Sequence, residues 1–272
     1  MSSLGTWEDA VQWLRGQPSQ ERLVLAAFYD DPLIQSATRY ADSSEWRAVR
    51  ALLPDPPGKA LDVGAGRGIS AFALARDGWD VTALEPDASA IVGAGAIRAL
   101  SEESGLPISI VETWGEQLPF DDASFDVVHC RQVLHHARDL EALSRECARV
   151  LRPGGVFIAT REHVISRDSD LQAFLDSHPL HNRYGGEHAY RQGRYRSALM
   201  GAGFSDLRSL NPYASDINLY PTTQDELRHR ISARLRWPWP GMIPDFALAL
   251  LGRRLDQPGR LYTFLCRKPI VA

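Results

Sequence analysis

Three glycines at alternating positions, Gly64, Gly66 and Gly68, follow a short apolar segment and precede a helical pattern. Because glycine has no Cβ, such a backbone turns tightly and lies close against a ligand. Glu85 stands seventeen residues beyond the last glycine, at the end of the next apolar run. An acidic residue at that place in a strand–helix–strand unit commonly accepts the two ribose hydroxyls of a nucleoside cofactor. The spacing therefore predicts a site for an adenosine-containing cofactor.

The glycine spacing also bears on which cofactor is bound. A dinucleotide site usually has the pattern G-x-G-x-x-G, whereas the third glycine here comes one residue early. The pattern therefore favours a cofactor other than NAD. Two alternatives stay open at this point: an NAD-linked oxidoreductase, and a cofactor-binding regulatory protein without transferase activity.

Further segments match one known family in order and spacing. They are Glu-Gln-Leu-Pro-Phe-Asp-Asp-Ala-Ser-Phe-Asp-Val-Val at 116–128, Val-Leu-His-His at 133–136 and Leu-Arg-Pro-Gly-Gly at 151–155. Together with the glycine loop and Asp62 before it, residues 58–162 resemble the class I (Rossmann-like) S-adenosylmethionine-dependent methyltransferases of small-molecule type. The resemblance implies S-adenosyl-L-methionine as cofactor and a seven-stranded, mostly parallel sheet whose last strand is antiparallel.

The resemblance also implies which residues touch the cofactor. The glycine-loop backbone is expected to line its methionine and ribose end, with Glu85 on the ribose hydroxyls and Pro86 closing the ribose pocket. Arg131 is placed where a guanidinium would pair with the methionine carboxylate in fork geometry. The expected cofactor-binding residues are Asp62, Gly64, Ala65, Gly66, Gly68, Glu85, Pro86, Trp114, Gly115, Glu116, Arg131 and Gln132.

Trp114 departs from the family pattern. In the family, an Asp two residues before the Glu of the Glu-x-Leu-Pro-Phe segment often holds the adenine amine, and here that position is Trp114. The usual hydrogen bond to adenine is therefore in doubt. An indole offers a large flat apolar face, so Trp114 either stacks on the adenine or packs against the neighbouring helix.

Histidines are crowded where an acceptor would lie. Methyl transfer from a sulfonium is an in-line displacement, so the protein positions the acceptor atom and removes its proton. Seven of the eight histidines fall between residues 129 and 188. His163, expected directly after the fifth strand, is the first candidate for the general base, and His136 is the second; His129 is expected to pack within its strand. These imidazoles favour oxygen as the methylated atom, while nitrogen, carbon and lipid-linked acceptors stay open.

Residues 184–190 combine glycines with aromatic and ionisable side chains, which is typical of a lid or an acceptor-binding loop. The expected acceptor-binding residues are His181, Tyr184, Glu187 and His188. A metal site is the other interpretation, because imidazole and carboxylate ligands suit zinc; its ligands would be His178, His181, Glu187 and His188. The first pair flanks a proline in a predicted loop and the resemblance requires no metal, so we predict none.

Residues 228–260 hold seven arginines and two aspartates, together with Trp-Pro-Trp-Pro at 237–240 and an apolar run at 246–251. The pattern indicates a helical cap with a solvated basic face. Peripheral contact with a membrane surface, or a patch for an anionic acceptor, is the alternative.

An alternating series of strands and helices must position these residues. Apolar spacing predicts strands at 60–64, 80–85, 107–112, 125–130, 155–160, 206–211 and 261–267, with helices at 67–77, 87–104, 139–150 and 193–200. Alternation of this kind implies an α/β fold with helices on both faces of the sheet and ligands at the carboxyl edge of its strands. Residues 1–57 are expected to form an N-terminal helical cap, and 58–272 the methyltransferase core with acceptor-pocket insertions at about 161–192 and 213–260.

Composition agrees with a cytoplasmic small-molecule enzyme. The 272 residues are 44% hydrophobic and 24% charged, enough for one sizeable core, and the net charge of −4 gives no reason to expect nucleic acid. Three cysteines lie far apart without a C-x-x-C pair, and no apolar stretch approaches the ~18 residues of a membrane span. The sequence predicts neither the identity of the acceptor nor the oligomeric state.

Overall fold

The computed structural model describes residues 5–270. Its sheet has the strand order β3-β2-β1-β4-β5-β8-β7, and the short β6 pairs with β5. The strands are β1 (Lys59–Val63), β2 (Asp80–Leu84), β3 (Ile108–Val111), β4 (Phe125–Arg131), β5 (Leu151–Ile165), β6 (Tyr190–Arg191), β7 (Ser205–Leu210) and β8 (Arg260–Arg267). Pairing is parallel from β3 to β5, and β8 is antiparallel to both β5 and β7. The predicted α/β fold with an antiparallel last strand is confirmed.

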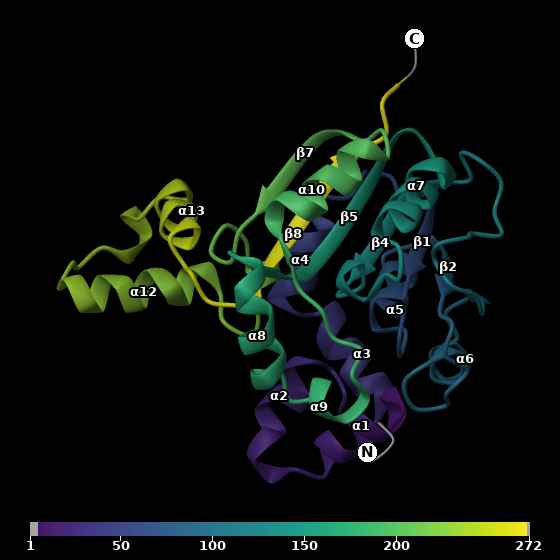
Figure 1. Cartoon of the computed structure of the whole chain (residues 1–272), viewed down its shortest axis with the longest axis horizontal. Helices are drawn as coiled ribbons and strands as arrows, with labels where there is room; N and C mark the ends of the chain where they lie inside the picture. Colours follow the sequence, from purple (N-terminus) through teal and green to yellow (C-terminus); the bar gives the residue numbers. More distant parts are fainter. Residues whose placement is uncertain (1–4, 271–272) are drawn as a thin grey trace.

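Helices cover both faces of the sheet (Figure 1). One hydrophobic core lies under α3 (Leu33–Ala41), α4 (Ser44–Arg50), α5 (Ile69–Arg76) and α6 (Ala94–Ser104), and a second under α7 (Leu140–Val150) and α10 (Gln192–Gly201). Helix α5 is buried all round, because it lies between the sheet and α3. Its N-terminus, which follows the glycine loop, is thereby held in place.

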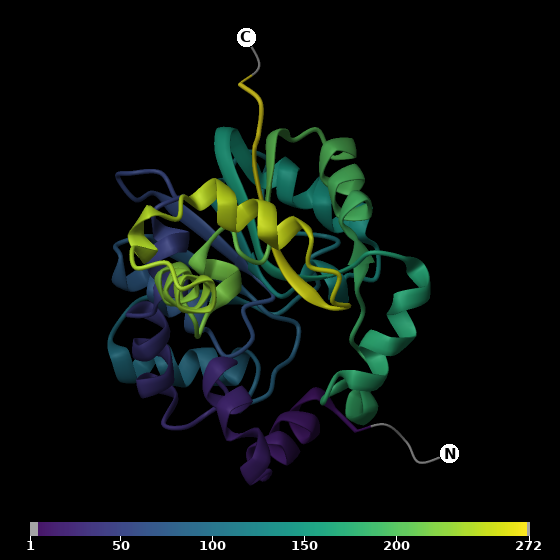
Figure 2. The ribbon, with the colours of Figure 1, turned by 90° about the vertical axis from the view of Figure 1, so that its left-hand side faces the viewer.

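Two groups of short helices gather at one end of the molecule, as Figure 2 shows. The first consists of α1 (Trp7–Arg15), η1 (Pro18–Gln20) and α2 (Glu21–Ala26), and the second of η3 (Asp168–Asp170), α8 (Leu171–Ser177) and α9 (His181–Tyr184). A capping box between Thr6 and Asp9 starts α1, whose buried Ala10 and Leu14 belong to a small core shared with Leu180. Segments far apart in the chain therefore form one cover.

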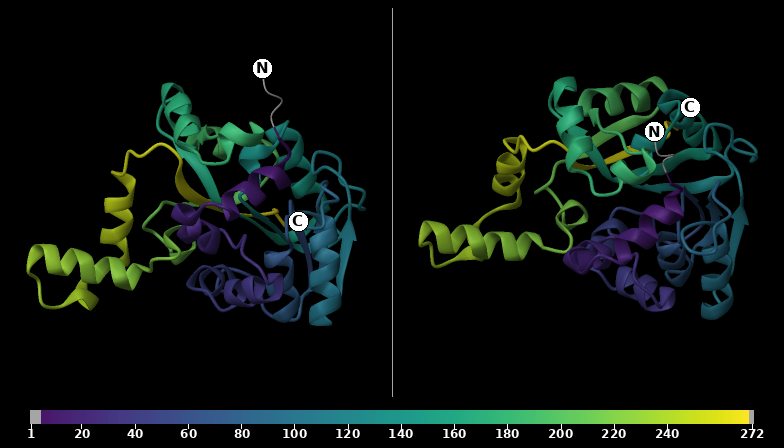
Figure 3. Two further views of the ribbon diagram at one scale, coloured as in Figure 1. Left: turned by 90° about the horizontal axis from the view of Figure 1, so that it is seen from below. Right: turned by 60° about the horizontal axis from the view of Figure 1, so that its bottom comes forward.

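A third group projects from the body (Figure 1, Figure 3). It contains α12 (Gln224–Leu235), η4 (Pro240–Met242) and α13 (Asp245–Arg253), and it follows α11 (Asp216–Leu219), which packs on α4. We call residues 224–253 the arm. No helix within residues 5–270 has both the length and the apolar character needed to cross a bilayer.

Two predicted elements differ by more than two residues from their bounds in the structure. β5 continues to Ile165 instead of ending at 160, because its extension pairs with β8 on one side and β6 on the other. His163 therefore lies inside a paired strand, opposite Leu261, and not in a loop after it. Helix α6 begins at 94 instead of 87, because Asp87 and Ser89 side chains accept the backbone N–H groups of the intervening turns.

Candidate active site

A cavity of about 680 Å³ opens where β1, β2 and β4 end. This is the carboxyl edge of the parallel strands, where ligands bind in open α/β sheets, and the volume is that of a typical small-molecule site. The N-terminal helices and the 178–187 segment supply the opposite wall. Every residue predicted to bind the cofactor lines this cavity except Gly68.

The glycine loop takes left-handed backbone conformations that favour glycine. Gly64 has φ +62°, and a Cβ there would lie 2.8 Å from a methyl carbon of Val133. Gly66 has φ +55° and is open toward the cavity. Gly68 is turned away instead, because it caps α5 and packs against Ile97, so its predicted cofactor contact is replaced by a role in shaping the turn.

Glu85 is almost fully buried at the end of β2. Its Oε2 accepts the Gly66 backbone N–H at 2.7 Å, and its Oε1 accepts that of Asp87 at 2.9 Å. A carboxylate has about four lone-pair sites, so acceptor capacity for two ribose hydroxyls is left. Burial raises the pKa of Glu85 to about 7, although the two N–H donors counteract it. The group fits the ribose role that the sequence predicted.

Asp62 lies buried in β1 and lines the cavity. Its Oδ1 is 2.7 Å from Nδ1 of His129, its register partner in β4, so His129 holds this carboxylate as well as packing within the strand. Its buried Oδ2 has no hydrogen-bond partner among the described residues. A buried, unpartnered carboxylate oxygen fits the ammonium group at the methionine end of the expected cofactor.

Arg131 differs from its prediction. The guanidinium fork holds Glu45 of α4, with Nε–Oε1 at 2.7 Å and NH2–Oε2 at 3.1 Å. Its remaining nitrogen NH1 donates to the side chain of Gln132 at 3.2 Å. Arg131 lines the cavity, but its fork is engaged with Glu45, and the predicted fork pairing with a methionine carboxylate is not the arrangement seen.

Trp114 lines the part of the cavity formed by the predicted cofactor-binding residues, which we call the cofactor half. Its side chain is half exposed. The Arg138 guanidinium lies 3.7 Å from the centre of its ring. The Arg138 backbone N–H donates to Glu116 at 2.9 Å, and a Cβ at Gly115 would lie 2.6 Å from Leu143. These three consecutive residues thus form a fixed edge of the cavity. The ring is not packed into the core.

The part of the cavity where the sequence predicted the acceptor, which we call the acceptor half, centres on Glu187. This buried carboxylate accepts the Tyr184 hydroxyl at 2.8 Å and lies 3.6 Å from Nε2 of His135, 3.9 Å from Nε2 of His136 and 3.8 Å from Nδ1 of His178. Two of the four predicted acceptor-binding residues, Tyr184 and Glu187, are therefore brought together.

The other two predicted acceptor residues lie outside the cavity wall. His181 and His188 are absent from its lining, and the His188 ring packs against Tyr190 with centroids 4.2 Å apart. His181 is the first residue of α9 and His188 lies between α9 and β6, and neither side chain reaches the cavity. Of the four metal ligands that the sequence offered, only His178 and Glu187 lie together.

His135 and Glu162 are the main residues that sequence reasoning missed. Glu162 is fully buried in β5 and accepts the backbone N–H groups of Val133, Leu134 and His135. Its Oε2 is also 2.6 Å from His135 Nδ1. Burial lowers the pKa of His135, but Glu162 and Glu187 outweigh that effect and raise it to about 9. The sequence signal that could have identified these two residues is an acidic residue within an apolar strand, close to a histidine-rich turn.

The two candidate bases are held in the same way. His163 Nδ1 lies 2.9 Å from the Gly259 carbonyl oxygen, and His136 Nδ1 lies 2.9 Å from that of Gly186. A carbonyl only accepts, so each Nδ1 carries the hydrogen and each Nε2 the lone pair. Burial lowers the pKa of His163 to about 3 and that of His136 to about 4. Both rings are neutral at physiological pH.

Burial works against the charged form of Glu187, but the hydrogen bond from His135 and the neighbouring imidazoles outweigh it. The pKa of this carboxyl is therefore held below its usual range. The acceptor half thus contains a carboxylate that stays ionised among several imidazoles.

The N-terminal segment is tied directly to the glycine loop. Arg67 donates to the carbonyl oxygens of Phe28 at 3.0 Å and Asp30 at 2.9 Å, and it pairs with Asp31. Tyr29, within this segment, lines the cavity. The loop that is predicted to meet the cofactor therefore also anchors the cover.

Comparison with known proteins points to one family. Residues 61–159 match the methyltransferase domain family. The ubiquinone biosynthesis O-methyltransferase of Klebsiella pneumoniae is 39% identical over 104 residues, which are 38% of this chain and 42% of that protein. The chain thus spans less than half the length of the curated relatives it matches.

Solved structures share the fold. Phosphoethanolamine N-methyltransferase 2 of Haemonchus contortus, solved with S-adenosylhomocysteine and phosphomonomethylethanolamine, has a TM-score of 0.58 at 18% identity, covering 90% of this chain and 60% of that one. An S-adenosylmethionine-dependent methyltransferase from Mesorhizobium loti has a TM-score of 0.53 at 20% identity, covering 84% and 100%. Residues 61–159 therefore carry a methyltransferase domain, and the chain shares the fold of S-adenosylmethionine-dependent methyltransferases.

Proposed function

We propose that the protein transfers the methyl group of S-adenosylmethionine to an oxygen atom of a small-molecule acceptor. The observation that carries this proposal is one continuous cavity with two chemically different halves. The glycine loop and Glu85 lie at one end, and imidazoles around Glu187 lie at the other. Relatives named O-methyltransferases support the choice of oxygen.

The residues of the cofactor half bind and orient. Asp62 Oδ2 receives the ammonium group, Glu85 accepts the ribose hydroxyls and the face of Trp114 lies against the adenine. When bound, S-adenosylmethionine supplies an electrophilic methyl group, whose C–S bond breaks with both electrons left on sulfur as the acceptor oxygen forms the new C–O bond. Fixed placement of the two reactants supplies much of the rate.

A histidine accepts the acceptor's hydroxyl proton. Both candidates, His163 and His136, line the cavity and have the Nε2 lone pair that a base requires. We place His136 first, because it follows β4 close to Gln132 and Val133 of the cofactor half, and its side chain is 35% exposed. His163 lies deeper, within β5. General base catalysis of this kind is typically worth about 10²–10⁴-fold.

The acceptor wall indicates the type of molecule that binds. Trp7, Leu14, Leu23, Tyr29 and Leu180 line it, in addition to the imidazoles. Apolar and aromatic walls with a few polar groups suit a flat or aliphatic molecule that carries a hydroxyl. We propose an acceptor of this class, and a cytoplasmic location in keeping with three free, buried cysteines.

A lipid-linked acceptor is the second candidate, and the arm favours it. Its exposed apolar side chains are Leu235, Trp237, Trp239, Met242, Phe246, Leu250 and Leu251. Arginines at 230, 234, 236, 253 and 254 lie among them. Tryptophans and arginines on one projecting element suit the interface of an anionic membrane.

The test is an assay with methyl-labelled S-adenosylmethionine and pools of hydroxylated metabolites. We expect a labelled methyl ether in the presence of the protein and none with Glu85→Ala, which loses the ribose contact. A calorimetric titration against NAD in parallel addresses the oxidoreductase alternative. Tight S-adenosylhomocysteine binding without a labelled product from any pool would favour the regulatory protein instead.

A further inference from the structure

The ionised Glu187 carboxylate has an unusual set of neighbours. Three imidazoles approach it within 4 Å, and the Tyr184 hydroxyl donates to it. Within residues 5–270, no lysine or arginine pairs with Glu187. Burying a carboxylate is costly unless a cation or several donors compensate it. The positive charge beside Glu187 therefore comes either from a protonated His135 or from a bound cation.

The tautomers of these rings leave acceptors pointing inward. His135 Nδ1 is tied to Glu162 at 2.6 Å, His163 Nδ1 to the Gly259 carbonyl and His136 Nδ1 to the Gly186 carbonyl. His163 and His136 then present an Nε2 lone pair, and His135 presents one when its Nε2 proton is displaced by a metal ion. Metal-binding histidines show this arrangement, with one ring nitrogen hydrogen-bonded to a carboxylate or a backbone carbonyl and the other on the metal.

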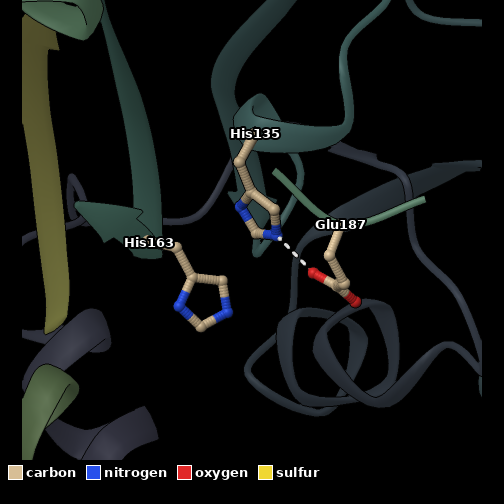
Figure 4. A group of neighbouring side chains, drawn as sticks. All are labelled: His135, His163 and Glu187. Atoms are coloured by element: carbon tan, nitrogen blue, oxygen red, sulfur yellow. Dashed lines mark ion pairs between the residues drawn. The ribbon is translucent and has the colours of Figure 1, made fainter. Parts of the chain in front are cut away.

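The ligand atoms also converge. One atom each from His135, His163 and Glu187 lie within 4.8 Å of one another, and Figure 4 shows the two rings facing the carboxylate from separate elements. His135 Nε2 is 3.6 Å from Glu187 Oε2. Tetrahedral zinc with bonds of about 2.0–2.1 Å places its ligands roughly 3.3–3.4 Å apart. The first pair is thus close to ligand spacing, and the His163 ligand atom lies within 4.8 Å of both.

We infer that His135, His163 and Glu187 form a binding site for one divalent transition-metal ion of zinc-like preference. Two imidazoles and one carboxylate are a known catalytic ligand set for zinc and for non-haem iron, and they leave coordination positions open. His178 Nδ1 is buried without a hydrogen-bond partner beside the same carboxylate and is available as a further ligand. All three ligands line the acceptor half of the cavity.

The open coordination position would allow the metal ion to bind the acceptor. An acceptor hydroxyl bound to the ion would be oriented by it and would lose its proton more readily, which assists attack on the methyl group. This role rests on the proposed methyl transfer, whereas the site itself does not. The competing arrangement is a doubly protonated His135, which would donate to Glu162 and Glu187 at once and would exclude a metal.

Metal binding is measured on the untagged full-length chain after treatment with a chelator. Zn²⁺ is titrated in competition with a chromophoric chelator, and Co²⁺ is titrated by its visible absorption. We expect one equivalent of each metal and the intense bands of Co²⁺ in a four- or five-coordinate site. His163→Gln and Glu187→Gln should each weaken Zn²⁺ binding by at least tenfold and remove these bands, and His181→Gln, from the same histidine-rich segment, should leave both unchanged.

Binding of S-adenosylhomocysteine reports on folding in every variant, because Glu85 and the glycine loop lie outside the cluster. Folded wild-type protein that retains less than one tenth of an equivalent of Zn²⁺ and leaves the Co²⁺ spectrum aqueous would overturn the site, and so would Gln variants that bind metal as wild type does. Methyl transfer is assayed separately. Binding of one full equivalent of metal without any methylated product would contradict the proposed function and would still support the metal site.

Discussion

The Glu85 carboxylate accepts the Gly66 backbone N–H at 2.7 Å, so the residue expected to hold the cofactor's ribose also holds the glycine loop. Its second oxygen holds the next turn through Asp87. Loop geometry and ribose recognition therefore depend on the same side chain.

Glu85→Gln is expected to weaken cofactor binding through both roles. The amide NH₂ would face a backbone N–H, and the ribose would lose a charged acceptor. A hydrogen bond to a charged group contributes about 1.5–3 kcal/mol, so affinity for S-adenosylhomocysteine should fall roughly 10- to 150-fold by calorimetry. Glu112→Gln, on an exposed pair with Arg98, is the matched control and should bind as wild type. Equal affinity in both variants would refute the ribose assignment.

Cofactor affinity should rise with pH through neutrality. Burial and the nearby charges of Asp87 and Asp62 raise the pKa of Glu85 to about 7. The hydrogen bonds from the backbone N–H groups of Asp87 and Gly66 lower this pKa and only partly offset the rise. Ribose hydroxyls donate to the ionised form, so below about pH 7 binding must release a proton and affinity falls about tenfold per pH unit. Calorimetry in two buffers of different ionisation enthalpy measures that proton. The dependence should disappear in Glu85→Gln.

The stability of the cofactor-free protein should change with pH in the opposite direction to the cofactor affinity. The pKa of Glu85 is higher in the folded state than the ordinary 4.5, so the folded state binds more protons between these values. The contribution of Glu85 to the free energy of unfolding therefore falls as pH rises from about 4.5 to 7. Urea titrations of wild type and Glu85→Gln across this range isolate the effect. A contribution that increases with pH would contradict the assigned burial.

The cofactor half could be predicted from sequence because its signals are local. The glycines, the strand before them and Glu85 lie within one strand–helix–strand unit, whose spacing directly reflects its geometry. Arg131 shows the limit of such reasoning. Its partner Glu45 lies 86 positions away on a helix whose docking no local pattern reveals.

The acceptor half depends on contacts that are distant in sequence. His163 moved from a predicted loop into β5 because residues of β8 pair beside it, and Gly259 just before β8 fixes its tautomer. His181 and Glu187 looked equivalent as polar loop residues, yet His181 lies in α9 and only Glu187 lines the cavity. Composition pointed to a segment that lines the cavity, and tertiary packing decides which of its side chains face it.

Trp114→Ala is expected to weaken cofactor binding only through loss of its contact with the adenine ring. Arg138 lies 3.7 Å from the ring centre, which holds the indole at the cavity edge. Base stacking on an aromatic side chain is typically worth about 1–3 kcal/mol, so S-adenosylhomocysteine affinity should fall roughly 5- to 150-fold. S-ribosylhomocysteine, which lacks the adenine, should bind the variant and wild type equally. An equal loss for both ligands would show that Trp114 acts on loop structure instead.

Glu45→Gln is expected to destabilise the fold strongly. Glu45 is fully buried and pairs with Arg131 through two hydrogen bonds and with Arg161 at 3.5 Å. Removing its charge leaves two buried guanidiniums uncompensated, which typically costs about 3–5 kcal/mol. Chemical denaturation measures the free energy of unfolding. Glu141→Gln, on the exposed pair with Arg194, is the control and should cost less than about 1 kcal/mol.

The arm is expected to bind anionic membranes through its aromatic side chains. Trp237, Trp239 and Phe246 are 44%, 58% and 74% exposed, and arginines flank them in sequence. Burying such side chains in an interface is favourable, and the arginines add attraction that salt screens. Wild type should co-sediment with phosphatidylserine-containing vesicles, less so at high salt, and a variant with all three residues changed to Ser should stay in the supernatant. Met200→Ser, which removes a similarly exposed apolar side chain from α10, should sediment as wild type does.

Because the arm lies outside the cavity lining, the triple variant should still bind S-adenosylhomocysteine normally. Wild type that stays in the supernatant at low salt would eliminate the membrane role and, with it, the case for a lipid-linked acceptor.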